Sequence, residues 1–147
     1  MINRLQELLN NLKELRDNID NYIRLTIVDN EAIICDMNSQ TQLFEQGIDR
    51  LGRAISSYAP YTERTIAVKL AQGKPTNRVT LRDTGDFHAS FVVYADKDKF
   101  FIDATDWKTN RLGEKYGEEI FGLTEDNLHI LIWEYIYPAL MERVREL

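Results

Sequence analysis

Four aspartates lie around two predicted turns, and they are the side chains of this sequence best suited to chemistry. Asp83 and Asp86 flank Thr84-Gly85, and Asp103 and Asp106 follow one predicted strand later. Carboxylate oxygens are preferred ligands of divalent cations, so this grouping is compatible with a metal-dependent enzyme. Aspartate also ends strands and stabilises turns by bonding backbone amides. We favour the turn role, and we expect no catalytic residue, no metal ion, no cofactor and no small-molecule substrate.

Other reactive side chains are scarce. Cys35 is the one cysteine, which excludes an internal disulfide and a cysteine-based zinc site, so we interpret it as a small buried residue. His88 and His129 are too few for a histidine-rich metal cluster, and we interpret both as packing or surface residues. The sequence has no Walker loop, no Gly-x-Ser-x-Gly elbow and no His-Glu-x-x-His motif.

Composition narrows the class of protein further. The chain has 147 residues, a formal net charge of −6 and 44% hydrophobic residues, which is the balance of a single globular domain over 1–147. No apolar run is long enough for a membrane span, and the N-terminus lacks the pattern of a signal peptide. A pI near 5.0 disfavours a dedicated nucleic-acid-binding protein. We therefore expect a soluble protein in a reducing compartment.

A basic island interrupts this acidic chain. This region of the sequence contains one carboxylate, Glu63, and five cations: Arg64, Lys69, Lys74, Arg78 and Arg82. Such an island is either a solvated face or a surface directed at an acidic partner subunit or at DNA phosphates.

Residues 1–24 are predicted to form an amphipathic helix. Its apolar side chains recur at alternating spacings of three and four, the a/d pattern of a heptad repeat, at Leu5, Leu8, Leu12, Leu15, Ile19 and Tyr22. We call these six residues the heptad seam. The seam either packs on the protein's own core or meets a neighbouring subunit.

Residues 25–123 are predicted to form an α+β core. Leu25 to Asp36 contains β-branched residues around a turn signal and predicts a strand or short hairpin. Asn38 or Ser39 is expected to cap a helix that runs through Gln46 and ends at Gly47. Thr62 is expected to cap a second helix, which ends at Gly73.

The second half of the core predicts the small sheet. A β pattern begins at Val79, and the alternation of apolar and polar residues from Phe91 indicates a half-buried strand. Asp96 to Lys99 is predicted to form a charged turn, and Phe100 to Thr105 is predicted to form the returning strand.

Residues 124–147 are predicted to form the C-terminal helix, capped by Thr124 and kinked or broken near Tyr137 by Pro138. Its predicted buried stripe is Leu128, Leu131, Ile132, Tyr135, Ala139 and Leu140, widened by Trp133 and Ile136. The fold class is therefore α+β: a small antiparallel sheet with a hairpin packed by helices, and long N-terminal and C-terminal helices.

The stretch from Leu81 to Phe91 resembles the Leu-x-Asp-Thr-Gly-x-Leu-x-x-Ser-Ile signature of tailed-phage virion-morphogenesis proteins, which complete the tail or join head to tail. Further on, Lys115-Tyr116-Gly117 is similar to the family's aromatic-Gly pair, and Ile120 to Thr124 is similar to its Pro-Phe-x-Gly-Leu-Ser/Thr motif. Glu119-Ile120 and Glu114-Lys115 depart from the family pattern. With the upstream stretches Gln42 to Asp49, Ser57 to Thr62 and Ala71 to Pro75, the resemblance covers roughly two-thirds of the chain, and it omits the heptad seam.

The residues of the signature suit an architectural role. Asp83 and Thr84 are expected to bond backbone amides across the turn, and Gly85 permits a positive φ. Phe87 and Phe91 should pack on one side of a helical step. The remaining members of the proposed structural motif are Ser90, Phe121, Gly122 and Leu123, of which Phe121 and Leu123 are expected to anchor the last helix.

The resemblance implies a structural virion protein at the head–tail junction, assembled in the host cytoplasm. It would form a ring of sixfold or twelvefold symmetry that joins portal-side and tail-side proteins and lets DNA pass as cargo. The expected interface residues are the heptad seam together with Tyr58 and Tyr61, and the loop from Asp49 to Pro60 is expected to reach an adjacent ring. The alternative is a regulatory or inhibitory module that captures one partner with the heptad seam.

Overall fold

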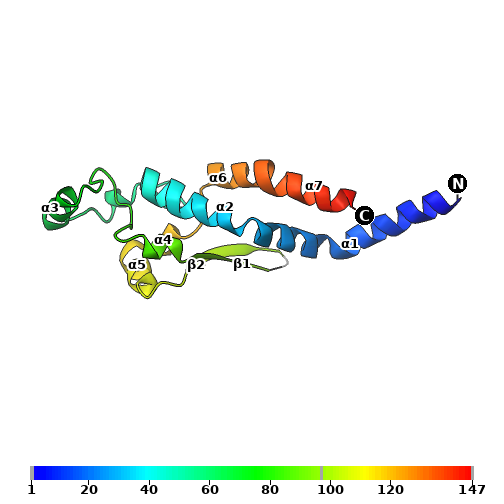
Figure 1. Cartoon of the computed structure of the whole chain (residues 1–147), viewed down its shortest axis with the longest axis horizontal. Coiled ribbons are helices and arrows are strands. Elements are labelled where there is room, and N and C mark those ends of the chain that lie inside the picture. The colour runs from blue at the N-terminus through cyan, green and yellow to red at the C-terminus, as the bar shows by residue number, and fades with distance from the viewer. Residues whose placement is uncertain (1, 97, 147) are drawn as a thin grey trace.

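The computed structural model describes residues 2–96 and 98–146. One long helical rod runs along the longest axis of the molecule, the C-terminal helices lie along one side of it, and a β-hairpin lies along another side (Figure 1). The expected α+β class, with a two-stranded antiparallel sheet and long terminal helices, is confirmed.

The rod consists of α1 (Ile2–Asp29), α2 (Glu31–Asp36) and η1 (Met37–Gln46). The strand or hairpin predicted from Leu25 to Asp36 is therefore wrong, and the first helix runs past residue 24. Asn30 interrupts the rod for a single residue, and the Ile34 amide already bonds to its carbonyl at 3.0 Å. The β-branched residues are helical here because Ile27 and Ile34 bury their side chains in the core, and this packing outweighs their strand propensity.

The segment η1 is π-helical, with wider turns than an α-helix. Asn38 and Ser39, predicted as caps, lie inside the rod and are buried. The predicted end of the helix is confirmed, because Gly47 takes the left-handed conformation at φ 63° and an added Cβ would lie 2.8 Å from Cβ of Arg78.

The hairpin pairs β1 (Phe91–Ala95) with β2 (Phe100–Ala104) in antiparallel register, with Val93 opposite Ile102. The predicted strands are thus confirmed, and the turn closes through the Asp96 amide and the Lys99 carbonyl at 2.8 Å. Lys97 of the predicted turn lies outside the described residues. The hairpin packs on α1 and α2, where the Val93 amide donates to Glu31 Oε2 at 2.9 Å.

Short elements connect the rod, the hairpin and the C-terminal helices. They are η2 (Ile55–Ser57), α3 (Glu63–Ala71), α4 (Asp86–Ala89), α5 (Thr109–Tyr116) and η3 (Glu118–Ile120). The Thr62 hydroxyl accepts from the Thr65 amide at 3.2 Å, so the predicted cap of α3 is confirmed. Val79 and Thr80 are buried in an extended segment without a strand partner, which corrects the predicted β pattern there.

The C-terminal helices are α6 (Glu125–Ile130), the π-helical η4 (Leu131–Ile136) and α7 (Tyr137–Arg145). Pro138 does not break them, because it stands in the first turn of α7 and the wider turns of η4 precede it. The Thr124 cap is confirmed, and Arg143 pairs with Asp29 of the rod. The predicted buried stripe is confirmed at Leu131, which is buried, and its members Leu128, Ile136, Ala139 and Leu140 are half-buried. The prediction is wrong at Ile132, Trp133 and Tyr135, which are exposed.

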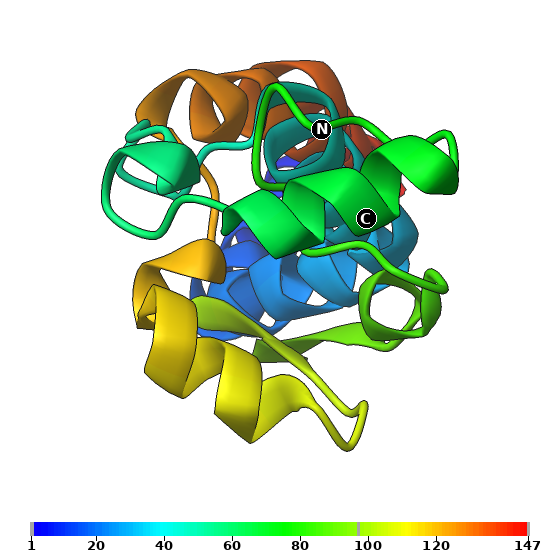
Figure 2. The ribbon, with the colours of Figure 1, turned by 90° about the vertical axis from the view of Figure 1, so that its left-hand side faces the viewer.

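The core lies where the rod, the hairpin, the short elements and the C-terminal helices meet. In an end-on view the C-terminal helices lie above the blue part of the rod, and the hairpin lies below it (Figure 2). Its most deeply buried apolar residues come from the middle and the end of the chain and are Ile34, Leu43, Ile55, Val79, Ile120 and Leu131. In the described part of the chain, no helix is long and apolar enough to cross a membrane.

Two buried amides of η1, Asn38 and Gln42, hold the segment that enters the C-terminal helices. Asn38 donates to the Ile120 carbonyl at 2.9 Å and accepts from the Gly122 amide at 2.8 Å. Gln42 donates to the Gly122 carbonyl and accepts from the Thr124 amide and from the Asn127 side chain, each at 2.9 Å. We call these two side chains the amide clamp. It satisfies backbone groups that would otherwise be buried without partners.

We predict that Gln42→Ala lowers the free energy of unfolding by about 3 kcal/mol, because it leaves three hydrogen-bonding groups of the 122–127 segment without a partner. Denaturant titration measures this change. Gln40→Ala is the matched control, since the Gln40 side chain makes only solvent-exposed bonds, to Glu45 and Arg82, and should cost less than about 0.5 kcal/mol. Equal losses in both variants would contradict the role of the clamp.

Candidate functional site

The turn from Asp83 to Asp86 leads into the short helix α4. Gly85 has φ 95°, so the predicted positive φ is confirmed, and the Thr84 hydroxyl accepts from the Asp86 amide at 3.3 Å. Asp83 does not bond the turn's amides as expected. It is exposed and pairs with Lys74 at 2.7 Å, and this ammonium lowers the pKa of the Asp83 carboxyl. Asp83 therefore ties the turn to the end of α3.

Ser90 joins the two ends of the hairpin. Its hydroxyl donates to the Phe87 carbonyl at 2.8 Å and accepts from the amides of Thr105 and Asp106 at 3.2 and 3.0 Å. The Ser90 carbonyl accepts from the Thr105 amide as well. One side chain thus holds the start of β1 against the chain that leaves β2.

Three phenylalanines of the structural motif form one cluster. The rings of Phe87 and Phe91 are 5.1 Å apart, and Phe121 lies 6.1 Å from the first and 5.6 Å from the second. Phe87 and Phe91 share one side because α4 is a helical step, which confirms the predicted packing. Edge-on aromatic contacts at these distances stabilise a core beyond simple burial. The cluster brings together residues 34 positions apart in the sequence.

Gly122 and Leu123 lie where the amide clamp holds the chain. Gly122 has φ 123°, and a Cβ there would lie 2.8 Å from Arg50 Cδ, so the backbone conformation and the close approach both favour glycine. Leu123 is half-buried against the core. All members of the structural motif therefore have architectural positions, and none of them lines a site with paired catalytic groups.

The four aspartates do not form a metal site. Asp83 pairs with Lys74, Asp103 accepts from its neighbouring Ala104 amide, and Asp106 accepts from the Lys108 amide. No group of three or more potential metal ligands occurs among residues 2–96 and 98–146.

The remaining reactive residues are isolated. Cys35 is half-buried in a helix rather than in a strand, and burial raises the pKa of its thiol to about 11, so it is a poor nucleophile. His88 packs its ring against Phe87 and Phe91, and its Nε2 is buried without a hydrogen-bond partner. Burial lowers the pKa of His88 to about 4, although backbone groups of Thr80 and Leu81 oppose this shift. His129 is exposed on α6.

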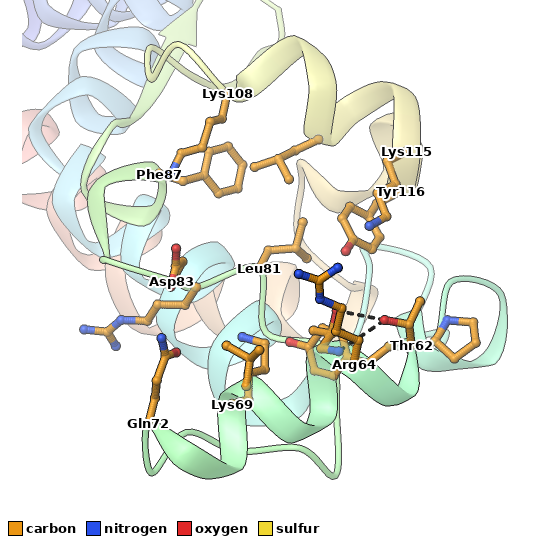
Figure 3. A pocket seen from close by; sticks show the side chains of 16 residues that line it. Thr62, Arg64, Lys69, Gln72, Leu81, Asp83, Phe87, Lys108, Lys115 and Tyr116 are labelled. Atoms are coloured by element: carbon orange, nitrogen blue, oxygen red, sulfur yellow. Dashed lines mark hydrogen bonds between the residues drawn. The ribbon is translucent and has the colours of Figure 1, made fainter.

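The basic island does not form one uniform face. Lys74 pairs with Asp83, while Arg78 bonds the Phe44 carbonyl and lies over the ring of Phe44 together with Arg82. Arg82 also lines a cleft of about 450 Å³ between α3 and α5, together with Arg64 and Lys69 (Figure 3). Two cations from outside the predicted island, Lys108 and Lys115, line the same cleft. The fold thus gathers positive charge in a concave site.

The heptad seam divides into two halves. Leu5, Leu8 and Leu12 expose 68%, 55% and 55% of their surfaces, while Leu15, Ile19 and Tyr22 are half-buried. The N-terminal part of α1 extends past the rest of the molecule, beyond the end of α7 (Figure 1). The seam is therefore partly covered only in its second half.

Tyr58 and Tyr61, the other predicted interface residues, both use their hydroxyls inside the chain. Tyr58 donates to the buried Asp49 at 3.2 Å, and burial together with this carboxylate raises the pKa of Tyr58 to about 12. Tyr61 bonds Thr80, and its ring lies under the Lys69 ammonium, 4.9 Å away. The ring of Tyr58 is partly exposed, whereas Tyr61 is half-buried.

Three features were not found from the sequence. Of the amide clamp, Asn38 was predicted as a possible helix cap and Gln42 only as part of the helix that follows. The signal for the clamp is that Ile34, Asn38 and Gln42 recur at spacings of four, which places them on one face of a continuous helix. The cleft depends on tertiary contact and has no local signal. The exposed apolar residues of η4, Ile132, Trp133 and Tyr135, were predicted as part of a buried stripe, because periodicity does not show which face of a helix is covered.

Comparison of the chain with protein families, with curated proteins and with solved structures found no match in any of the three.

We predict that Ser90→Ala lowers the free energy of unfolding by about 1 kcal/mol and raises amide exchange at Thr105 and Asp106, whose N–H groups lose the hydroxyl. Hydrogen exchange with denaturant titration measures both effects. Ser57→Ala is the control, because Ser57 is exposed and bonds only the Ala54 carbonyl. Unchanged exchange at the hairpin base would contradict the assignment.

We predict that stability falls as the pH drops from about 6.5 to about 4. The pKa of His88 is lowered in the folded state, so the unfolded chain takes up the proton at a higher pH than the folded chain does. The contribution of neutral His88 to the free energy of unfolding is therefore complete above pH 6.5 and is lost as the pH falls to about 4. The loss should be about 3 kcal/mol. His88→Gln should flatten this part of the stability profile, while His129→Gln should retain it. A steep profile in the His88 variant would assign the loss to other groups.

Proposed function

We propose that this chain is a non-enzymatic structural protein of a tailed-phage virion, located at the head–tail junction. In this proposal it forms a ring of sixfold or twelvefold symmetry between portal-side and tail-side proteins, and DNA passes through the ring as cargo. Assembly takes place in the host cytoplasm. The contacts between subunits are heterologous, because a closed ring requires two different faces on each protomer.

The observation that carries the proposal is the exposed first half of the heptad seam. Leucines at these positions are normally covered, and an apolar stripe that extends beyond the body of a protein marks a contact with another chain. The second half of the same seam is half-buried. The helix is thus fixed at one end and available to a neighbour at the other.

The positions of the motif residues also support an architectural role. Ser90, the aromatic cluster and Gly122 hold the hairpin, the rod and the C-terminal segment together. Ser90, Phe87 and Phe91 of the segment that resembles the phage signature thus contribute to the packing of the fold, which is compatible with a structural role. The resemblance itself supplies the virion context.

The exposed seam also favours a second candidate, a regulatory or inhibitory module that captures one partner. The two proposals differ in assembly state, because the module predicts a monomer or a dimer joined through the seam. A ring protein instead predicts a larger closed assembly.

We predict that the purified protein forms a six- or twelve-subunit annulus and that Leu8→Glu with Leu12→Glu reduces it to monomers. Two carboxylates in an apolar contact would be buried without partners, which costs far more than the contact gains. Light scattering and negative-stain imaging of the same fraction measure the outcome. The unfolding free energy should change by less than about 0.5 kcal/mol, since both leucines are exposed.

The control adds the same charge to the opposite face of the helix, as Gln6→Glu with Asn10→Glu, and should leave the assembly intact. A dimer that the seam variant dissociates would favour the regulatory module. An annulus that survives the seam variant would contradict the assignment of the interface.

A further inference from the structure

We propose that the cleft between α3 and α5 binds an acidic peptide segment of a partner protein, with carboxylates at its rims and an apolar side chain on its floor. We call this site the α3–α5 cleft. It lies at the end of the molecule opposite the exposed half of the heptad seam (Figure 1), so this contact is separate from the proposed subunit contact of α1. The inference does not depend on ring formation.

Charge is the first argument for an acidic ligand. Five cations line the α3–α5 cleft, and they come from three separate segments: Arg64, Lys69, Arg82, Lys108 and Lys115. Asp83 is the one carboxylate of the lining, so the lining carries a net charge of +4 in a chain whose net charge is −6. The rest of the chain therefore carries −10. Such segregation of charge attracts an anionic group to the cleft and repels it from the remaining surface.

These cations are not paired with carboxylates in the part of the chain that the structure describes. Across the described residues, none of the five forms an ion pair, and Asp83 is already paired with Lys74. Lys69 and Lys115 rest instead on the rings of Tyr61 and Tyr116, at 4.9 and 5.1 Å from the ring centres. Lys69 and Lys108, on opposite rims, both contribute to the lowered pKa of Asp83, so their fields overlap inside the cleft.

The floor of the cleft is built around a strained residue. Leu81 has φ 52°, a conformation that leucine rarely adopts, and it is the one positive-φ residue other than glycine in the described chain. The neighbouring Thr80 is buried, and its amide donates to the Tyr61 hydroxyl at 3.0 Å, which fixes the backbone next to Leu81. Backbone strain of this kind persists where the surroundings enforce it, often at binding sites. The Leu81 side chain lies between the two helices (Figure 3).

The shape and lining favour a peptide over a nucleic acid. Tyr61 and Tyr116 are each covered by a lysine, and Phe87 is 2% exposed, so the cleft offers little aromatic surface for a base to stack on. The cleft has a volume of about 450 Å³, which suits a concave site that takes up a few side chains. The backbone of a nucleic-acid duplex would instead bind along an open basic surface. Leu81, Val68 and Leu112 provide contact for an apolar side chain between carboxylates.

The test is fluorescence anisotropy with a labelled peptide that has two glutamates on each side of a Leu-Phe pair. The intact protein should bind it saturably, and binding should weaken as salt is added. Arg64→Glu with Lys115→Glu should weaken binding at least tenfold. Replacing Leu-Phe by Ser-Ser in the peptide should also weaken it, because the floor then loses its apolar contact.

The control variant is Lys13→Glu with Arg16→Glu, which makes the same change in net charge on α1 and should alter the affinity less than twofold. Both variants change exposed side chains, and thermal unfolding checks that they remain folded. Absence of saturable binding, or equal weakening in the two variants, would overturn the proposal. Tighter binding of a short DNA duplex that the cleft variant abolishes would also overturn it and identify the cleft as a phosphate site. So would a salt-sensitive self-association lost in the cleft variant, which would make a second copy the occupant.

Discussion

The hydrogen bonds of Asn38 and Gln42 are the constraint on which the arrangement of this molecule depends. The C-terminal helices reach the rod through residues 120–124, and the Ile120 carbonyl, both backbone groups of Gly122 and the Thr124 amide bond to side chains of the rod. The amide clamp supplies these side chains from within η1. A buried amide without a partner costs more than a satisfied one gains, so the network specifies a single register between rod and C-terminal segment. The aromatic cluster then packs against the segment that the clamp has fixed.

Stability is distributed unevenly along the rod. Its central part carries the buried residues Thr26, Ile27 and Ile34, while Leu5, Leu8 and Leu12 in the first half of α1 are exposed. A long helix gains most of its stability from packing of its apolar face. The exposed half of the seam is therefore a segment whose stability a partner chain would increase. In the proposed ring, assembly would order the part of the protein that the fold itself supports least.

The charge distribution follows a similar division. Carboxylates dominate most of the surface, yet cations from α3, from the segment after Thr80 and from α5 meet in one cleft. Contacts with the tyrosine rings hold Lys69 and Lys115 in place, and these contacts do not neutralise the positive charge of the lysines. A molecule with an apolar contact at one end and a basic cleft at the other has two distinct faces. Two distinct faces are what heterologous assembly requires.

The amino-acid sequence by itself determined the local features of this protein. Thr62 and Thr124 cap helices, Gly47 ends one, Gly85 opens a turn, and alternating residues form the hairpin, because each of these signals acts through neighbours in the chain. Only the tertiary structure decided the rest. The β-branched stretch from Leu25 to Asp36 is helical because burial of Ile27 and Ile34 outweighs propensity. Asn38 and Gln42 became a clamp, and five scattered cations became a cleft, because both depend on segments distant in sequence that meet only when the chain is folded.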